Sequence, residues 1–504
     1  MSDGAEQTGT QTGTLVHDHL HEVARSGAAT LAGALVSTVA TFGLVVLITR
    51  SVPPDVAGRF FVATALFLIA LATAGLGTDT GLARFVLRSG SPAEVRRLLR
   101  VAAPPVLVAS VALAILLAAL VPATRPLAWA LPFAAAADLS LGAVRAHASF
   151  ASTVAIDRVA RPALQVALVA FVLAAGLPGG ALAIAWASAY VVSAVLATRS
   201  LSSRLSRGGE RVLVGPGGTG GGAFWSFTSP RAVARIAQIA IQKLDIVLVA
   251  WLLTPADAAA YTVATRFVVF GQLANQAISS VVQPRFTLLL AERDHDRVAL
   301  SRVFGTTTCW SLLLAWPVYA CVAAAPAAYL GWFGGAYVTT ENRAVALVMV
   351  LGMLVAVASG PVDTLLLMSG RSGRSLTNTL VALAVDVVLC LVLVPRLGIV
   401  GAALAWVAAV VLRCALAVVQ LRAEVSLRPD LRMLALAGLL PLTCIAAPLL
   451  VADRIVGLGP SAWLAGCLLA SLGYAATVWR LRSVLAVDVL VTALGGRRGS
   501  VALP

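Results

Sequence analysis

Long apolar runs dominate the chain, and polar or turn-forming residues separate them at regular intervals. Read as runs of about twenty residues bounded by arginine, proline or glycine, the pattern predicts fourteen membrane-spanning helices. The predicted spans are 27–49, 60–83, 101–122, 127–148, 160–177, 180–198, 232–253, 258–282, 303–325, 344–367, 376–395, 399–420, 433–452 and 461–479. The pattern therefore predicts an all-α polytopic membrane protein.

Two adjacent predicted spans, the seventh and the eighth, are unusually polar. At about 100° per residue, five polar side chains of the seventh share an arc of about 80°. They are Arg231, Arg235, Gln238, Gln242 and Asp245, with Lys243 well round the helix, and the eighth carries Arg266 and a stripe of Thr265, Gln272, Gln276, Ser279 and Gln283. An unpaired charge in hydrocarbon costs several kcal/mol. We therefore expect the stripes to line a water-filled cavity; the alternative is that they pair across the bundle and only hold helices together.

Composition supports the membrane assignment. The 504 residues are 60% hydrophobic and 12% charged, with a mean hydropathy of +0.93. The net charge of +15 comes from arginines dispersed between apolar runs, which does not indicate a nucleic-acid partner. All six cysteines lie inside apolar runs without metal-ligand spacing, so we expect free thiols and no metal site. The polar segment that contains His17, His19 and His21 is expected to be a floppy tail.

The arginines also predict the orientation of the chain. With the N-terminus inside, 26 arginines fall in cytoplasmic segments and 6 in outer ones. This bias follows the positive-inside rule. It predicts a multi-pass protein of the cell membrane with both termini in the cytoplasm.

The sequence divides into two matched halves. A shift of 201 residues places Pro54 on Pro255 and Arg84-Phe85 on Arg285-Phe286, and the matched spans run in the same direction. Between the halves, the glycine-rich stretch 215–222 lacks the lysine of a phosphate-binding loop and indicates a flexible linker. The predicted segments are a tail (1–25), an N-lobe (26–198), a cytoplasmic linker (199–230), a C-lobe (231–422), two further spans (423–482) and a second tail (483–504).

Several short motifs, in this order and spacing, resemble a known family. They are Asp245-Ile246-Val247-Leu248, Ala259-Ala260-Tyr261 through Arg266, Gln283-Pro284-Arg285-Phe286, Trp332-Phe333-Gly334-Gly335-Ala336-Tyr337, Ser369-Gly370-Arg371, and Pro395 through Ala405. They lie between residues 245 and 405. The sequence resembles the lipid-linked oligosaccharide and polysaccharide flippases of the MOP superfamily, which also includes the peptidoglycan-precursor flippases and the MATE multidrug exporters.

The resemblance implies two lobes that rock and expose a central cavity to each side in turn. The implied cargo is an undecaprenyl-diphosphate-linked glycan moved from the inner to the outer leaflet. Its headgroup charge requires cations in a wet cleft while the polyprenyl tail stays in lipid. The predicted substrate-binding residues are Arg266, Arg235 and Arg145 within the membrane, Arg50 and Arg59 at the outer mouth, and Gln238, Gln242, Gln272 and Gln276 along the stripes.

The acidic residues at membrane depth are candidates for ion coupling. Asp245, Asp79 and Asp363, together with Lys243, are predicted to couple transport to H⁺ or Na⁺, with no other cofactor. An equal interpretation is that the carboxylates neutralise the arginines. Drug-exporting relatives depend on acidic cation sites, so a multidrug/cation antiporter stays an alternative function, as does a peptidoglycan-precursor flippase.

An enzyme is the rival from another class. No Ser/His/Asp or Cys/His arrangement occurs in any predicted loop, and the longest predicted outer loop, about 326–343, holds one acid, Glu341, and no histidine. The sequence therefore predicts a transporter and not a membrane enzyme. The expected partners are the lipid-linked glycan, the bilayer, and the glycan polymerase and glycosyltransferases of the same pathway. We expect a monomer.

Overall fold

The computed structural model describes residues 30–87, 92–146, 150–207, 221–291, 297–422 and 430–488, and within these ranges every regular element is a helix. Each predicted span is helical over most of its length. By length and composition, nine helices of the described ranges qualify as membrane spans, or up to ten when a bent pair counts as one. The chain is therefore an all-α, multi-pass membrane protein, and the count of fourteen stays a prediction.

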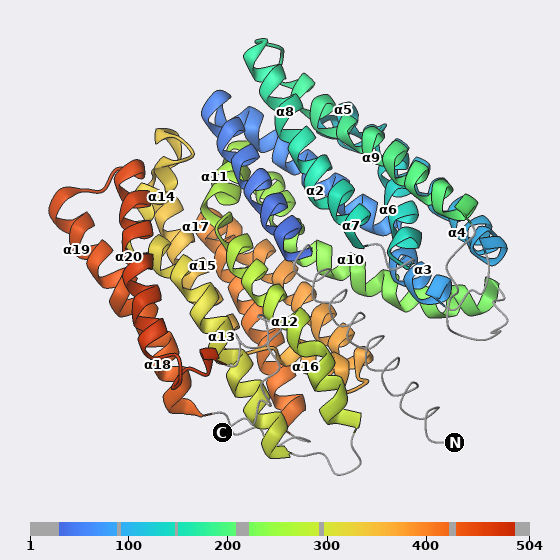
Figure 1. Ribbon diagram of the computed structural model, residues 1–504. Coiled ribbons are helices and arrows are strands. Elements are labelled where there is room, and N and C mark those ends of the chain that lie inside the picture. Colours follow the sequence, from blue (N-terminus) through green and yellow to red (C-terminus); the bar gives the residue numbers. More distant parts are fainter. Residues whose placement is uncertain are drawn as a thin grey trace, which may run out of the picture.

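The first half of the chain forms one bundle, drawn from blue to teal in Figure 1. Its elements are the helix Thr30–Ser51, α2 (Pro54–Ala74), α3 (Thr78–Leu87), α4 (Pro92–Leu120), η1 (Pro122–Thr124), α5 (Arg125–Ala128), α6 (Leu131–Ala146), α7 (Phe150–Thr153), η2 (Val154–Ala160), α8 (Arg161–Ala174) and α9 (Gly180–Arg207). The ring of Phe67 packs against Trp186 and Tyr190, with centroids 5.4 and 5.2 Å apart. These aromatic contacts join α2 to α9 in the bundle core.

The second half of the chain, up to Arg422, forms the second bundle. It comprises α10 (Gly221–Leu252), α11 (Pro255–Thr265), α12 (Val268–Ala291), α13 (Arg297–Ala324), α14 (Pro326–Gly331), η3 (Gly335–Tyr337), α15 (Thr340–Ala358), α16 (Val362–Met368) and α17 (Ser372–Arg422). Non-helical backbone at Gly398, with φ of 59°, divides α17 into two helices, because glycine adopts positive φ without strain. These two helices are the predicted eleventh and twelfth spans.

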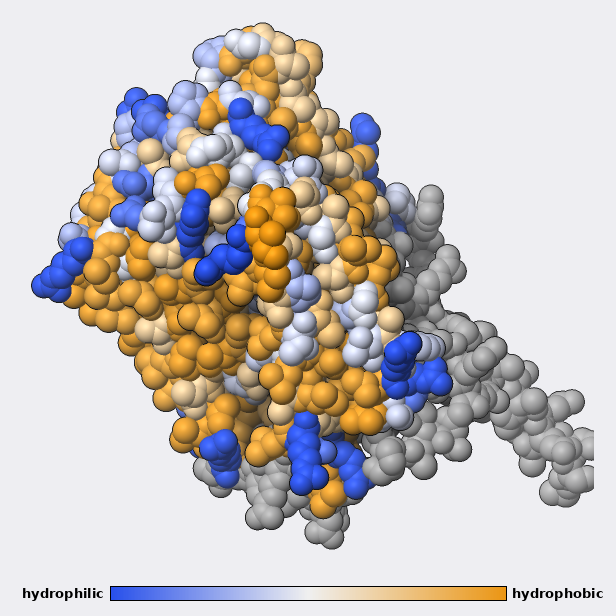
Figure 2. Space-filling model, turned by 90° about the vertical axis from the view of Figure 1, so that its left-hand side faces the viewer, coloured by the Kyte–Doolittle hydropathy of each residue, from blue (hydrophilic) through white to orange (hydrophobic). Residues whose placement is uncertain are grey.

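The last helices lie on one side of the second bundle, at the left in Figure 1. They are α18 (Leu431–Pro441), η4 (Leu442–Ala446), α19 (Ala447–Val456) and α20 (Pro460–Arg480). The indole of Trp463 donates to the carbonyl of Cys321, and the hydroxyl of Tyr474 donates to that of Leu313. These bonds attach α20 to α13. The face in Figure 2 carries a broad apolar band with hydrophilic residues gathered toward its upper and lower ends, as a bilayer requires.

The two bundles meet tightly at their predicted outer ends. A Cβ on Gly58 of α2 would overlap the carbonyl oxygen of Pro255, the first residue of α11. Arg50 donates from Nε to the carbonyl of Trp332 at 2.6 Å and from Nη2 to that of Gly331 at 3.3 Å. Phe42 packs edge-on against Phe333 at 5.4 Å. The predicted outer side is closed.

The predicted linker 199–230 differs from the structure at both of its ends. Helix α9 continues to Arg207, and α10 already begins at Gly221, so flexible backbone was the wrong prediction for these two segments. The physical reason for the helix at 221–230 is packing. Phe224 is fully buried, and a Cβ on Gly77 would stand only 2.8 Å from the carbonyl oxygen of Thr228. Most of the glycine-rich stretch 215–222 lies outside the described residues, as do His17, His19 and His21.

Candidate functional site

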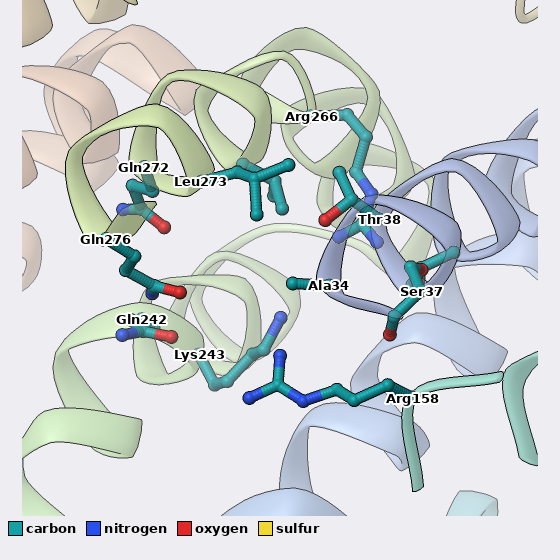
Figure 3. A pocket seen from close by; sticks show the side chains of 12 residues that line it. Ala34, Ser37, Thr38, Arg158, Gln242, Lys243, Arg266, Gln272, Leu273 and Gln276 are labelled. Atoms are coloured by element: carbon teal, nitrogen blue, oxygen red, sulfur yellow. The ribbon is translucent and has the colours of Figure 1, made fainter. Parts of the chain in front are cut away.

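A cavity of about 250 Å³ lies between the two bundles. Its walls come from the helix Thr30–Ser51, from η2, from α10 and from the junction of α11 and α12 (Figure 3). The lining residues are Ala34, Ser37, Thr38, Thr41, Arg158, Gln242, Lys243, Arg266, Val269, Gln272, Leu273 and Gln276. The predicted cavity therefore exists, and both polar stripes contribute to it.

The cavity lining is cationic. Three of its side chains carry positive charge, Lys243, Arg266 and Arg158, and no carboxylate of the described residues lines it. In Figure 3, Lys243 and Arg158 reach into the cavity from opposite bundles. Within the described part of the chain, the side chains of Lys243 and Arg266 have no hydrogen bond or ion pair. Such a set of donors, with three glutamines beside it, is suited to a multiply charged anion with oxygen acceptors.

A break in the eighth predicted span places Arg266. Helix α11 ends at Thr265 and α12 begins at Val268. The hydroxyl of Tyr329 donates to the carbonyl of Val263 at 2.8 Å and accepts from the amide of Phe267 at 3.2 Å. These two groups are four residues apart and would bond to each other in an unbroken helix. Tyr329 thus inserts into the helical ladder, and Arg266 sits at the resulting break.

A π-helical turn places Arg158. Residues Val154–Ala160 form η2, and the following Arg161 turns inward, where it bonds to the Asp157 carboxylate at 2.7 Å and to the Tyr190 hydroxyl at 2.8 Å. Arg158 instead lines the cavity, with only a 3.8 Å ion pair to Asp157. The sequence analysis missed Arg158 because the fifth span was predicted to begin at residue 160. The helical backbone begins ten residues earlier, at Phe150.

The polar stripe of the seventh span divides in the structure. Gln242 and the neighbouring Lys243 line the cavity, whereas Arg235 and Gln238 are exposed and do not. Asp245 turns away into the second bundle. The stripe as a whole does not line the cavity, because the cavity meets α10 around residues 242 and 243 and because the Tyr261 hydroxyl holds Asp245 inside the second bundle. Of the predicted substrate-binding residues, Arg266, Gln242, Gln272 and Gln276 come together.

The remaining predicted arginines lie elsewhere. Arg145, in the last turn of α6, donates to the carbonyl of Leu141 at 3.3 Å, and its charge acts on Asp157. Arg59 forms an exposed ion pair with Asp55 one turn earlier. Arg50 bonds the outer ends of the bundles together. In this conformation none of the three lines the cavity.

Asp245 lies in a buried acidic site behind the cavity. Its carboxylate accepts from the hydroxyl of Tyr261 at 2.7 Å and from the amide of Ile246 at 2.8 Å. Asp386 of α17 is fully buried nearby, close enough for its charge to act on the same tyrosine. Its Oδ2 has no hydrogen-bond partner among the described residues, and its other oxygen has only the Cys390 thiol, 3.9 Å away. Two carboxylates with an unsatisfied oxygen can bind a proton or a small cation. Sequence reasoning did not single out Asp386.

The two other acidic candidates have local partners. Asp79, at the start of α3, accepts from the amide of Thr80 at 2.8 Å. Asp363 of α16 pairs with Arg413 at 3.6 Å, which agrees with the interpretation that some carboxylates neutralise arginines. Neither lines the cavity.

Comparison with known proteins extends these observations. A family described as "Polysaccharide biosynthesis protein" matches residues 102–337, a range that includes Arg158, Lys243 and Arg266. No curated protein sequence matches the chain.

Among solved structures, the lipid II flippase MurJ in an inward closed conformation is similar, with a TM-score of 0.72 and 11% identity over 90% of this chain and 99% of that one. An inward-facing multidrug resistance MATE family transporter of the MOP superfamily has a TM-score of 0.56 and 14% identity, and the match covers 79% of this chain and 98% of that one. A MOP superfamily transporter from Pyrococcus furiosus has a TM-score of 0.53 and 14% identity, and the match covers 80% of this chain and 95% of that one. At these identities, the likeness establishes a shared fold.

Proposed function

We propose that the chain is a member of the polysaccharide biosynthesis branch of the MOP superfamily and that it flips an undecaprenyl-diphosphate-linked oligosaccharide from the inner to the outer leaflet. The family match over residues 102–337 and the shared fold support this proposal. The lobes rock so that the outer contact, closed in this structure, opens when the inner side closes, and the cavity faces each side in turn. The observation that carries this proposal is the cationic lining between the lobes, formed by Lys243, Arg266 and Arg158, with no carboxylate among the lining residues that the structure describes.

The charge balance of the cavity suits a diphosphate. Such a headgroup cannot cross hydrocarbon as a bare anion, because its desolvation cost is many kcal/mol. Three cations offset that charge, and the guanidinium groups of Arg266 and Arg158 can each hold phosphate oxygens through two parallel N–H donors. Gln242, Gln272 and Gln276 supply both donors and acceptors, which suit the hydroxyl groups of the attached sugars.

The direction of transport follows from the proposed orientation. We place the chain in the cell membrane with both termini in the cytoplasm, according to the arginine bias. The tight contacts at Gly58 and Arg50 then close the outer side, and the cavity is the loading site for cargo from the inner leaflet. Polyprenyl-linked cargo requires glycosyltransferases to assemble it inside and a polymerase to use it outside.

Coupling to an ion gradient is assigned to the buried acidic site. Asp245 and Asp386 lie on α10 and α17, away from the cavity, so that H⁺ or Na⁺ binds without competing with the cargo. Lys243, an ion-coupling candidate by sequence, belongs to the cargo site instead.

A peptidoglycan-precursor flippase is the second candidate, because the MurJ fold covers 90% of this chain. Both cargoes carry a diphosphate, so the cationic lining suits either. A multidrug/cation antiporter fits less well, because a cationic drug would meet only positive charge in the cavity.

Proteoliposomes containing the purified full-length chain test the proposal. The assay measures how much undecaprenyl-diphosphate-linked oligosaccharide becomes accessible to an added lectin. We expect Arg266→Ala and Lys243→Ala each to slow the transfer at least about tenfold, since each removes a charge-assisted interaction. Arg454→Ala, which removes the same charge from an exposed position on α19, is the matched control.

Transfer of the oligosaccharide at the wild-type rate by both cavity variants would refute the anion-binding role. Two further measurements separate the candidate functions. Faster transfer of a peptidoglycan precursor than of the oligosaccharide, in the same vesicles, would favour the second candidate. Sensitivity of deletion cells to cationic drugs, with normal surface glycan, would favour the antiporter.

A further inference from the structure

The helix Thr30–Ser51 packs against η2 at Gly33. A Cβ on Gly33 would overlap Cγ1 of Val154 and would stand 3.1 Å from Cβ of Arg158. Val154 and Arg158 are four residues apart, so the backbone at Gly33 touches neighbouring turns of η2. Gly33 is itself buried in this contact. The two helices approach each other this closely because residue 33 has no side chain.

The groups that face Gly33 have little freedom to move aside. Valine carries two methyl groups on its Cβ and strongly prefers one χ1 rotamer in a helix. Arg158 meets Gly33 through its Cβ, which moves only with the backbone. A side chain at residue 33 would therefore push the backbone of η2 away from the first helix.

The same contact determines how far Arg158 reaches into the cavity. Ala34 and Ser37, which follow Gly33 on the first helix, line the cavity, and in Figure 3 the Arg158 side chain extends beneath them. Among the described residues its guanidinium has only the 3.8 Å ion pair with Asp157. Because no shorter bond holds this guanidinium, its position depends on where the backbone of η2 lies.

The π-helical turn gives Arg158 and Arg161 different directions. In an α-helix, residues three apart lie within about 60° of each other around the axis, so both guanidinium groups would face the same way. A π-helix holds more residues in each turn. Here Arg161 bonds to Asp157 and Tyr190 inside the first bundle. Arg158 faces the cavity instead. A π-turn is also wider than an α-turn, and Gly33 leaves the space that this width requires.

We propose that Gly33 is a positioning residue of the cargo site. Its missing side chain lets η2 approach the first helix, and this approach places the Arg158 guanidinium where it can contact an anionic cargo. Gly33 does not line the cavity, so it acts through Arg158 and not through the cargo. The inference rests on the proposed function, because it takes the cargo to be an anion that Arg158 binds.

A double-mutant cycle on the purified full-length chain tests the proposal, with an undecaprenyl-diphosphate-linked oligosaccharide as the titrant. We expect Gly33→Ala to weaken binding at least about tenfold, as Arg158→Ala does, because each takes a charge-assisted interaction from the cargo. In the double variant Gly33→Ala/Arg158→Ala, the affinity should equal that of Arg158→Ala alone. A glycine with a structural role only would add its own loss to that of Arg158→Ala.

Two further variants test the steric cause. Adding Val154→Ala to Gly33→Ala removes the overlapping methyl group and should recover most of the lost affinity. Gly43→Ala is the matched control, because it lies on the same helix with nothing within 4 Å of its added Cβ, and it should bind as the wild type does.

The outcomes separate this inference from the proposed function. Wild-type affinity in Gly33→Ala, or additive losses in the cycle, would overturn the positioning role and leave the function intact. Wild-type affinity in Arg158→Ala would also overturn the role, and if Arg266→Ala and Lys243→Ala bound normally as well, the function would fall with it. If Gly33→Ala does not fold, Val154→Ala should restore both folding and affinity, and failure of either would overturn the role.

Discussion

The hydroxyl of Tyr329 offers a sharp test of how the fold positions the cargo site. It is the single atom that separates the carbonyl of Val263 from the amide of Phe267, and Arg266 occupies the break that results. Tyr329→Phe removes the hydroxyl group that holds the two helical segments apart. The donor and acceptor are already the pair that an α-helix would join, so we expect the ladder to close.

The size of the stability change follows from the local bonds. The Val263 carbonyl also accepts from the amide of Arg266 at 3.2 Å, so it keeps a partner whichever way the backbone relaxes. Only the Phe267 amide is at risk, and a buried donor without a partner costs about 1–3 kcal/mol. A closed ladder recovers that cost but rotates Arg266 away from the cavity. We therefore expect a stability loss below about 1 kcal/mol together with at least about a tenfold loss of cargo affinity.

Two measurements on the purified protein distinguish these outcomes. Thermal unfolding reports the stability change, and titration with an undecaprenyl-diphosphate glycan reports the affinity. Tyr319→Phe is the matched control, since that hydroxyl is buried in α13 and has no hydrogen-bond partner among the described residues. Wild-type affinity in Tyr329→Phe, or an equal loss in Tyr319→Phe, would refute the argument.

Three further predictions concern the closed outer side and the acidic site. Gly58→Ala should push the lobes apart at α11 and shift the population toward outward-facing molecules, as measured by spin-label distances across the outer ends, whereas Gly43→Ala, with nothing within 4 Å, should not. Arg50→Gln should act in the same direction but more weakly, by about 1–2 kcal/mol for two lost bonds to carbonyl groups. Asp245→Asn should abolish ion-driven transport while cargo affinity rises, and an affinity below that of the wild type would contradict this prediction.

The chain's helices could be predicted because hydropathy alone decides which segments enter a bilayer. The breaks within them could not. The break at Arg266 depends on Tyr329, more than sixty residues away, and no local pattern near Arg266 records that contact. The division of α17, in contrast, coincides with Pro395 and Gly398, where local backbone chemistry interrupts a helix.

The site was predictable where side chains were polar within an apolar run, as at Gln242, Gln272 and Arg266. It was missed where charges lie close together near the end of a span. Arg158 belongs to such a group, and the pattern indicated a loop. In the structure, the side chains of the neighbouring Asp157 and Arg161 neutralise each other across one helical turn, so that a segment with several charged residues continues as a helix.

The placement of Lys243 and Asp245 supplies a physical route for coupling. Two residues apart, they project about 200° from each other around α10, so their charges lie on opposite sides, about 10 Å apart. At an effective dielectric constant of about 20, a unit charge at Asp245 changes the energy of an anion beside Lys243 by about 1.7 kcal/mol. Neutralising the carboxylate with H⁺ or Na⁺ therefore favours cargo binding by roughly tenfold or more, and cargo must favour ion binding by the same factor. Cargo affinity measured with and without the ion, in the wild type and in Asp245→Asn, tests this reciprocity: the ion should strengthen binding only where the carboxylate is present.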